Sequence, residues 1–244
     1  MATDGERLDR FLARRGIGSR RTCARRIADG RVTVNNAGAT EPGRRIRPGH
    51  DVVLVDGRPV PEQQETRRIL LLHKPRGYVC SRSSAEGRSV FDLISGVAER
   101  LAPAGRLDKN SEGLLVLSND GDLIYRLTHP RFQHEKTYRV TVSGPVTDTV
   151  LRRLSSRLVL DGYRVQPARV RILRKGAKPG RTILEFVLKE GRKRQIRLLC
   201  AAADLTVERL VRTRINQLEL SGLKPGQWRE ATAKDLARLD PGTG

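Results

Sequence analysis

The stretch GRLDKNSEGLLVLSNDGD, residues 105–122, places one carboxylate in a loop directly before an apolar run. The run at 114–117 is apolar and β-prone, which predicts a buried strand, and Asn119-Asp120-Gly121 predicts the turn that ends it. Asp108 therefore lies a few residues before a rigid strand, as a catalytic carboxylate would. The alternative is that Asp108 only hydrogen-bonds the backbone of its own loop, as aspartate often does in turns.

The composition indicates a polyanion as the partner. The 244-residue chain is long enough for a small domain joined to a medium one. Its 48 lysines and arginines outnumber 27 aspartates and glutamates, which gives a formal net charge of +21. Nucleic acid is the commonest partner of so basic a protein. Arginine-rich codon usage would explain the preference for arginine over lysine, but not the excess of both over acidic residues.

No membrane segment, disulfide bond or metal site is expected. The N-terminal segment lacks the apolar core of a signal peptide, and no stretch approaches the roughly 20 apolar residues that span a bilayer, so we expect a cytoplasmic protein. Cys23, Cys80 and Cys200 form no Cys-x-x-Cys pair, and the four histidines lack metal-ligand spacing. A metal-dependent RNA enzyme such as a nuclease would need a carboxylate or histidine cluster, which the sequence does not show.

The first sixty or so residues predict a small basic module of two helices and short strands. The first helix is expected to end at Gly16-Ile17-Gly18, after which Ser19 can cap the second helix. Two apolar stripes at helical spacing are expected to face inward: Leu8, Phe11 and Leu12 on the first helix, and Ala24, Ile27 and Ala28 on the second. Short strands are expected at 31–35 and 51–55, with Pro48-Gly49 in a turn between them.

The outer face of this helical pair is strongly positive. Between Arg7 and Arg31 the chain has nine arginines against two aspartates: Arg7, Arg10, Arg14, Arg15, Arg20, Arg21, Arg25, Arg26 and Arg31. Most of them lie off the apolar stripes, as phosphate-contacting side chains do. We predict RNA contacts at Arg20, Arg21 and Arg25, with an ordinary solvated basic face as the alternative.

The rest of the chain predicts a linker and a larger α+β domain. Residues 56–68 are polar with two prolines, and we place the domains at 1–62 and 69–244 with a linker at 63–68. Strands are expected at 69–72, 137–142, 168–173, 183–188 and 207–220, and helices at 147–154, 195–203 and 233–239. Regular crossover helices and a phosphate-cradling glycine-rich motif are missing, so neither a doubly wound sheet nor a nucleotide cofactor is expected.

Two sets of motifs resemble known families. The segment RLDRFLARRGIGSRRTCARRIADGRVTVNN, followed by IRPGHDVVLVDG, resembles the ribosomal-protein S4 type of RNA-binding domain. The segments HKPRG, GRLDKNSEGLL, HEKTY and EGRKRQIR, with the closing RTRINQLELSGLKPGQWRE, resemble the RsuA and RluB/E/F family of RNA pseudouridine synthases, and the last two are most similar to the RluF branch. The resemblance implies an S4-type domain of two helices plus short strands, followed by a catalytic domain with a mixed, largely antiparallel sheet and flanking helices.

The resemblance also implies a reaction. The bond from ribose to a ring nitrogen of uridine breaks, the uracil rotates and a carbon-carbon bond replaces it, without metal or cofactor. Asp108 takes the position of the nucleophile, because a carboxylate can add to an electrophilic sugar or base carbon and leave again. Arg197 is implied as its partner, since a guanidinium favours the charged form of a poorly solvated carboxylate. Tyr138 is implied to stack on the target uracil, and its hydroxyl to assist proton removal from the rotated base.

Further residues are assigned to RNA contact or to the pocket wall. Arg106 is implied to enter the RNA helix in place of the flipped base, which offsets part of the few kcal/mol that flipping costs. Phosphate contacts are predicted for Arg192, Lys193 and Arg194, with a solvated basic turn as the alternative. Lys74 is predicted to contact RNA, and the alternative is that it simply precedes a Pro-Gly turn. Ile196 and Leu114 are expected to wall the uracil pocket or to be ordinary core residues.

Three histidines receive no catalytic role, and one residue differs from the pattern of the family. His73 either touches RNA or precedes a turn, and His129 and His134 are interpreted as structural because no partner would make them a general base. Leu198 follows the QIR segment where relatives carry a second arginine, which affects RNA affinity or target choice more than chemistry.

The prediction is a monomeric RNA pseudouridine synthase that acts on 23S ribosomal RNA of the large subunit. The same chemistry on 16S ribosomal RNA or on a transfer RNA anticodon stays open, and so does the choice between ribose and base as the site of attack. A different class, a non-catalytic RNA-binding or ribosome-assembly protein with this fold, would be indicated by a changed Asp108 or Arg197, and neither is changed.

Reversing the charge of Arg20, Arg21 and Arg25 together is expected to weaken RNA binding and to leave the chemistry at Asp108 intact. Phosphate contacts release counterions, so the loss is largest at low salt and the salt dependence of the affinity flattens. RNA affinity measured over a salt series for both proteins tests this, and an unchanged affinity at moderate salt would contradict it.

Overall fold

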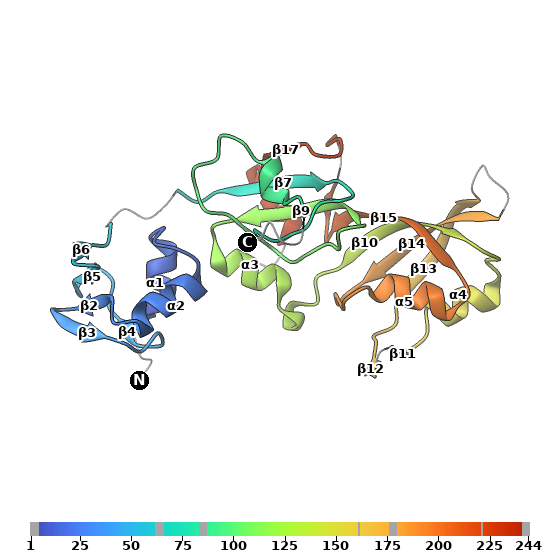
Figure 1. Cartoon of the computed structure of the whole chain (residues 1–244). Helices are drawn as coiled ribbons and strands as arrows, with labels where there is room; N and C mark the ends of the chain where they lie inside the picture. Colours follow the sequence, from blue (N-terminus) through green and yellow to red (C-terminus); the bar gives the residue numbers. More distant parts are fainter. Residues whose placement is uncertain are drawn as a thin grey trace. The chain divides into compact units, whose positions relative to one another are not determined.

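The computed structural model describes residues 5–61, 66–82, 87–160, 162–175, 180–220 and 222–240. The chain forms two compact units (Figure 1). The first comprises residues 1–68 with 98–101 and 119–121, and the second contains the rest. Half of the proposed linker at 63–68 falls outside the described residues, and its boundaries stay a prediction.

The first unit packs two helices against short strands. The helices are α1 (Leu8–Arg14) and α2 (Arg20–Ala28), and the Ser19 hydroxyl accepts a 3.1 Å hydrogen bond from the Thr22 amide, which confirms the predicted cap. Leu8, Phe11, Leu12, Cys23 and Ile27 are buried in its core. The prediction for Ala28 is wrong: it is exposed, because Cys23 and Ile27 already form the inward stripe at a spacing of one turn.

The strands of the first unit form two small sheets. They are β1 (Glu6–Arg7), β2 (Val32–Val34), β3 (Ala37–Ala39), β4 (Arg45–Ile46), β5 (Val53–Val55) and β6 (Arg58–Pro59). One sheet has the order β3-β2-β5-β6, and β1 pairs with β4. The strands expected at 31–35 and 51–55 are confirmed as β2 and β5, and they pair with each other in antiparallel fashion.

The described residues of the second unit contain a nine-stranded sheet with the central order β13-β14-β10-β15-β9-β7-β17. Its strands are β7 (Ile69–Lys74), β8 (Ala102–Pro103), β9 (Glu112–Ser118), β10 (Lys136–Ser143), β13 (Arg169–Lys175), β14 (Arg181–Leu188), β15 (Thr206–Ile215), β16 (Leu218–Glu219) and β17 (Trp228–Glu230). Every pairing is antiparallel except that between β9 and β15. The expected mixed, largely antiparallel sheet is therefore confirmed.

Helices cover this sheet at two places. They are α3 (Gly121–Thr128), α4 (Asp148–Leu154), α5 (Gln195–Ala202) and α6 (Ala233–Leu239), with 3-10 turns at Val90–Leu93 and Pro130–Phe132 and a separate hairpin of β11 (Val159–Leu160) and β12 (Tyr163–Arg164). The predicted helices α4, α5 and α6 are confirmed, and α3 was not expected. No helix among the described residues is long and apolar enough to cross a membrane.

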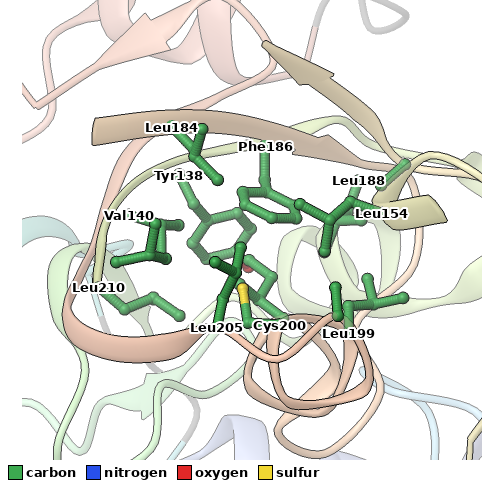
Figure 2. Close-up of a cluster of buried hydrophobic side chains, with 14 of the residues drawn as sticks. Tyr138, Val140, Leu154, Leu184, Phe186, Leu188, Leu199, Cys200, Leu205 and Leu210 are labelled. Carbon is green, nitrogen blue, oxygen red and sulfur yellow. The ribbon is translucent and has the colours of Figure 1, made fainter. Parts of the chain in front are cut away.

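The described residues of the second unit form two hydrophobic cores. One lies between β10, β14 and the helices α4 and α5, and its largest members include Phe186, Leu199 and Tyr138 (Figure 2). The other surrounds β7, β9, α3 and α6 and includes Leu114. The sheet thus forms a continuous support whose two halves are each closed by helices.

Gly113 is required where the two halves of the sheet meet. Its φ of 115° lies in a region that favours glycine, and a Cβ at this position would approach the backbone oxygen of Arg212 to 2.2 Å. Gly113 on β9 and Arg212 on β15 are register partners. The absence of a side chain allows the strand after the Asp108 loop to lie against β15.

Replacing Gly113 with alanine is expected to lower the free energy of unfolding by about 2 kcal/mol or more, because the added methyl meets backbone that cannot yield and the backbone angle becomes strained. Gly121→Ala is the matched control, since nothing lies within 4 Å of a Cβ there and no positive φ is imposed. Chemical unfolding of both variants provides the comparison. Equal stabilities of the two variants would contradict the proposed close approach.

Candidate active site

Asp108 lies in the loop between β8 and β9 and is half-buried. The amide of Ser111 donates a 3.0 Å hydrogen bond to the backbone oxygen of Asp108, which closes the turn. Among the described residues, no hydrogen bond or ion pair engages the side-chain carboxylate of Asp108. The alternative in which this carboxylate only satisfies its own loop is therefore not what the structure shows.

Lys74, at the end of β7, anchors this loop through hydrogen bonds to its backbone. Its side chain is fully buried, and its ammonium donates to the backbone oxygens of Pro75, Lys109 and Ser111 at 3.0, 3.3 and 2.7 Å. Burial lowers the pKa of Lys74 to about 8, while the negative charge of Asp108 acts in the opposite direction. The prediction that Lys74 contacts RNA is wrong, because its side chain is fully buried and its three N–H donors are all taken by backbone carbonyls.

Two further contacts fix the residues beside Asp108. The thiol of Cys80 lies 3.5 Å from both the amide nitrogen and the carbonyl oxygen of Leu107. The amide of Gly77 donates a 2.8 Å hydrogen bond to the carbonyl of Lys109. The sequence analysis considered Cys80 only to exclude a disulfide bond and a metal site, so its role in supporting the loop was missed.

Arg197 reaches the same loop from α5. One of its terminal nitrogens donates a 2.9 Å hydrogen bond to the carbonyl of Asn110, and the other lies 3.4 Å from the carbonyl of Val207. Burial lowers the pKa of Arg197, whereas the charge of Asp108 raises it. The Arg197 guanidinium is thus within electrostatic range of Asp108, but it is held by backbone oxygens and not by a direct ion pair.

Tyr138 projects from β10 and is 8% exposed. It lies opposite Phe186 on β14 and Arg212 on β15, and a register shift in the β10–β15 pairing falls immediately before it. Its ring belongs to the hydrophobic core that Figure 2 shows, and it also lines the hollow beside Asp108. Such packing fixes the ring, which suits a surface on which a base stacks.

A hollow of about 390 Å³ brings most of the predicted site residues together. Its walls include the predicted residues Arg106, Asp108, Tyr138, Arg192, Lys193, Arg194, Ile196 and Arg197. Among the described lining residues, Asp108 is the single carboxylate, and it faces five cationic side chains. The volume lies within the range of roughly 300–1,000 Å³ typical of small-molecule pockets. The site therefore combines one nucleophilic oxygen group with strong attraction for an anionic substrate.

The apolar walls differ in part from the prediction. Ile196 lines the hollow, whereas Leu114 is buried in the other core, which is the second of the two alternatives that the sequence left open for it. Its place is taken by Leu107, Leu188 and Leu210. Only Leu107 adjoins a motif residue in the sequence, and nothing in the local pattern marks the other two.

The basic loop before α5 is ordered by its own polar contacts. Arg194 is the residue before the helix and has a left-handed φ of 55°. The Gln195 side chain accepts from the Arg192 amide at 3.3 Å and donates to the Glu190 carboxylate at 2.6 Å. Arg192 lies 3.4 Å above the centre of the Tyr163 ring. These contacts leave the cations at the rim of the hollow.

The histidines have structural partners. His73 is buried, and its Nδ1 donates to the carbonyl of Leu223 at 2.8 Å. His129 accepts from the Arg131 amide, and His134 lies 2.6 Å from the side-chain nitrogen of Asn216. No group of three or more His, Cys, Asp and Glu side chains that could hold a metal ion occurs in the described part of the chain.

The arginines predicted to bind RNA in the first unit are exposed to different extents. Arg21 and Arg25 lie on the surface, and Arg25 is 3.8 Å from Asp29. Arg20 forms an ion pair with the buried carboxylate of Asp9, in which Nη2 and Oδ2 are 3.1 Å apart. A negative charge at position 20 would face Asp9, so changes at Arg21 and Arg25 separate RNA binding from stability more cleanly.

Comparisons with known proteins identify the family of this chain. A family model for RNA pseudouridylate synthase matches residues 68–202, and an S4 domain model matches residues 6–52. An uncharacterized RNA pseudouridine synthase of Aquifex aeolicus is 38% identical over 96% of this chain and 93% of its own. The ribosomal large subunit pseudouridine synthase B of Bacillus subtilis is 35% identical over 96% and 95% of the two chains.

Two further similarities extend over nearly the whole chain. The dual-specificity RNA pseudouridine synthase RluF of Escherichia coli is 35% identical over 96% of this chain and 78% of its own. A crystal structure of a pseudouridylate synthase superposes with a TM-score of 0.68 at 27% identity and covers 96% of this chain and 99% of its own.

Fold and site define an RNA-modifying isomerase with an attached RNA-binding domain. The chain belongs to the RNA pseudouridine synthase family and carries an S4 domain ahead of the catalytic domain. The family predicted from the four motifs is thereby confirmed. The relatives named synthase B and RluF are equally similar at 35% identity, so identity alone favours neither branch.

Lys74→Met is expected to lower the catalytic rate on the order of tenfold to a hundredfold while leaving RNA affinity nearly unchanged, because loosening the loop by about 1 Å misplaces Asp108. Lys193→Met is the matched control: the same change at an exposed residue of the hollow should weaken RNA affinity more than the rate constant. Single-turnover rates and filter-binding affinities are the measurements. If Lys74→Met behaved like Lys193→Met, Lys74 would be an RNA contact after all.

Proposed function

We propose that this enzyme converts a uridine of large-subunit ribosomal RNA to pseudouridine with Asp108 as the nucleophile. The observation that carries the proposal is the hollow in which Asp108 is the single carboxylate among the described lining residues and five cations surround it. The backbone at 107, 109, 110 and 111 is held by Cys80, Lys74, Gly77 and Arg197, so the carboxylate is presented by a fixed loop.

The proposed reaction proceeds on a flipped-out uridine. The cations of the hollow bind the RNA backbone, and Arg106 occupies the space that the base leaves. The uracil stacks on the ring of Tyr138, while Asp108 attacks a carbon of the sugar or of the base. The bond from ribose to the ring nitrogen breaks, the uracil rotates, and a bond from ribose to a ring carbon forms. The oxygen of Asp108 leaves the carbon that it attacked, the proton on the ring carbon is removed with the hydroxyl of Tyr138 assisting, and the released ring nitrogen takes up a proton. The product is an isomer of the substrate, so no redox partner is involved and no group is lost from the RNA.

In this proposal Arg197 supports the nucleophile electrostatically and takes no covalent part in the reaction. Its guanidinium is anchored on Asn110 and lies within electrostatic range of Asp108. As negative charge shifts from the carboxylate to the substrate and back, a fixed positive group nearby needs no reorganisation. This favours a role in electrostatic stabilisation.

The choice of ribosomal RNA rests on the relatives. The Bacillus subtilis protein is named for the large ribosomal subunit, and the Escherichia coli protein is described as dual-specific. We place the enzyme on 23S ribosomal RNA in the cytoplasm, as a monomer, with the S4-type unit docked on folded RNA. A 16S ribosomal RNA site or a transfer RNA anticodon would appear as a different position in the experiment that follows.

The decisive experiment is a pseudouridine map of ribosomal and transfer RNA from three strains: wild type, a strain without the protein, and one carrying Asp108→Ala. We expect one position to lose its pseudouridine in both altered strains, because removing a covalent nucleophile lowers rates on the order of a thousandfold or more. Purified Asp108→Ala protein should keep its affinity for the same RNA.

Two outcomes would count against the proposal. A position lost in the deletion strain but retained with Asp108→Ala would remove Asp108 from the role of nucleophile. A purified wild-type protein that binds ribosomal RNA tightly and forms no pseudouridine in any transcript would favour the non-catalytic binding protein.

A further inference from the structure

A second hollow of about 340 Å³ lies beside the catalytic one in the same unit. The two share Arg106, Tyr138 and Arg192 in their walls. Whatever binds in the second hollow therefore lies next to the target nucleotide of the proposed reaction.

Arg212 is the most deeply buried charged group of this second hollow. It is 2% exposed, and its Nε donates a 2.8 Å hydrogen bond to the carbonyl of Leu114. One terminal nitrogen, Nη2, is buried without a hydrogen-bond partner among the described residues. A buried guanidinium nitrogen without an acceptor is costly, so the site is incomplete as it stands.

His134 contributes a second donor without an acceptor. The side-chain oxygen of Asn216 accepts from the Glu135 amide, so its nitrogen must donate, and Nδ1 of His134 is the acceptor at 2.6 Å. The imidazole proton of neutral His134 is therefore on Nε2, which is buried and unpaired among the described residues. His134 lines the same hollow.

Lys136 is the third donor, two residues after His134 and opposite Ile215 of β15. Its ammonium donates a 3.0 Å hydrogen bond to the carbonyl of His134, which leaves further donor capacity. Burial and, to a smaller extent, the nearby charge of Arg212 lower the pKa of Lys136 to about 8. Two cations are thus held close together with no carboxylate bound to either.

The surrounding groups do not neutralise these cations. Glu190 is the single carboxylate among the described lining residues, and its Oε1 already accepts from the Gln166 amide at 2.8 Å and from the Gln195 side chain at 2.6 Å. A nucleobase would need acceptors as well as donors for its edge, whereas a phosphate only accepts hydrogen bonds. The excess of donors favours a phosphate.

We propose that the second hollow binds a backbone phosphate of the substrate RNA adjacent to the target uridine, through Arg212, Lys136 and His134. This inference rests on the proposed function for the identity of the RNA. Occupation of this site would satisfy the buried donors and would fix the strand beside Tyr138 while the target base enters the catalytic hollow.

The test uses binding and not turnover, so that it can be read even if the proposed chemistry fails. All proteins carry Asp108→Ala in addition, and the probe is a ribosomal RNA hairpin containing the mapped uridine, or, if no position maps, the ribosomal RNA fragment that the protein protects from nuclease. Lys136→Met is expected to weaken binding about tenfold and to reduce the salt dependence by about one phosphate contact. Lys234→Met, an exposed lysine on α6 outside both hollows, is the matched control for the loss of one charge.

The phosphate is identified with a set of hairpins, each of which carries one uncharged methylphosphonate linkage at a different position near the target. Each hairpin is bound to the Asp108→Ala parent and to the Lys136→Met variant. We expect one linkage adjacent to the target to weaken binding to the parent protein about tenfold and to have no further effect with Lys136→Met. Lys136→Arg, which keeps the charge, should restore the sensitivity, and melting curves show that each variant is folded.

Three results would overturn the proposal. One is that Lys136→Met loses no more affinity than Lys234→Met. Another is that every neutral linkage weakens both proteins equally, which would mean that no phosphate is bound at Lys136. The third is that RNA binding is insensitive to all linkages while inorganic phosphate raises the melting temperature of the parent but not of Lys136→Met, which would assign the hollow to a free anion.

Discussion

The burial of one ammonium group, that of Lys74, is the constraint on which the catalytic loop depends. A lysine taken out of water loses its hydration, and burial lowers the pKa of Lys74 to about 8. Three backbone carbonyls replace the lost water, and two of them, those of Lys109 and Ser111, belong to the loop that carries Asp108. If the loop moved away, the ammonium would keep only the Pro75 carbonyl as an acceptor, which costs more than the loss of an ordinary surface contact. The loop that presents Asp108 is thus held by the same interaction that makes the end of β7 stable.

Charge is distributed so that the substrate completes the site. Cations outnumber carboxylates in both hollows, and each hollow has one carboxylate among its described lining residues. In the second hollow that carboxylate, Glu190, is engaged by neutral donors and not by cations. Repulsion among the cations is therefore relieved only when an anion enters, and RNA supplies several phosphates at once. The described linings of the two hollows together hold eight lysine and arginine side chains against two carboxylates, at the places where the backbone of the RNA would run.

The sequence predicted the elements better than the contacts between them. The strands at 69–72 and 137–142 and the helix at 195–203 follow from apolar periodicity, which is a local property, and all three are present. The four motifs placed Asp108, Tyr138 and Arg197 at one site because their order matched a family. The role of Lys74 could not be predicted, because a lysine before a Pro-Arg-Gly turn is normally exposed, and its burial is imposed by the strands on either side of it. The sequence left two alternatives open for Leu114 for a similar reason, since β9 is buried throughout and no alternation shows which core a residue faces.

The pairing of β9 with β15 connects the two hollows physically. Arg212 on β15 is the register partner of Gly113, and its guanidinium also donates to the carbonyl of Leu114. Gly113 follows Asp108 by five residues, and the intervening loop is the one held by Lys74. Arg212 therefore contacts β9, the strand that begins beside the nucleophile loop, through both its backbone and its guanidinium. A phosphate that binds the unpaired Nη2 of Arg212 would act on this contact. Binding energy from a part of the RNA that does not react would in this way help to hold Asp108 in its reactive position, which is how enzymes commonly use remote contacts to raise the rate of the chemical step.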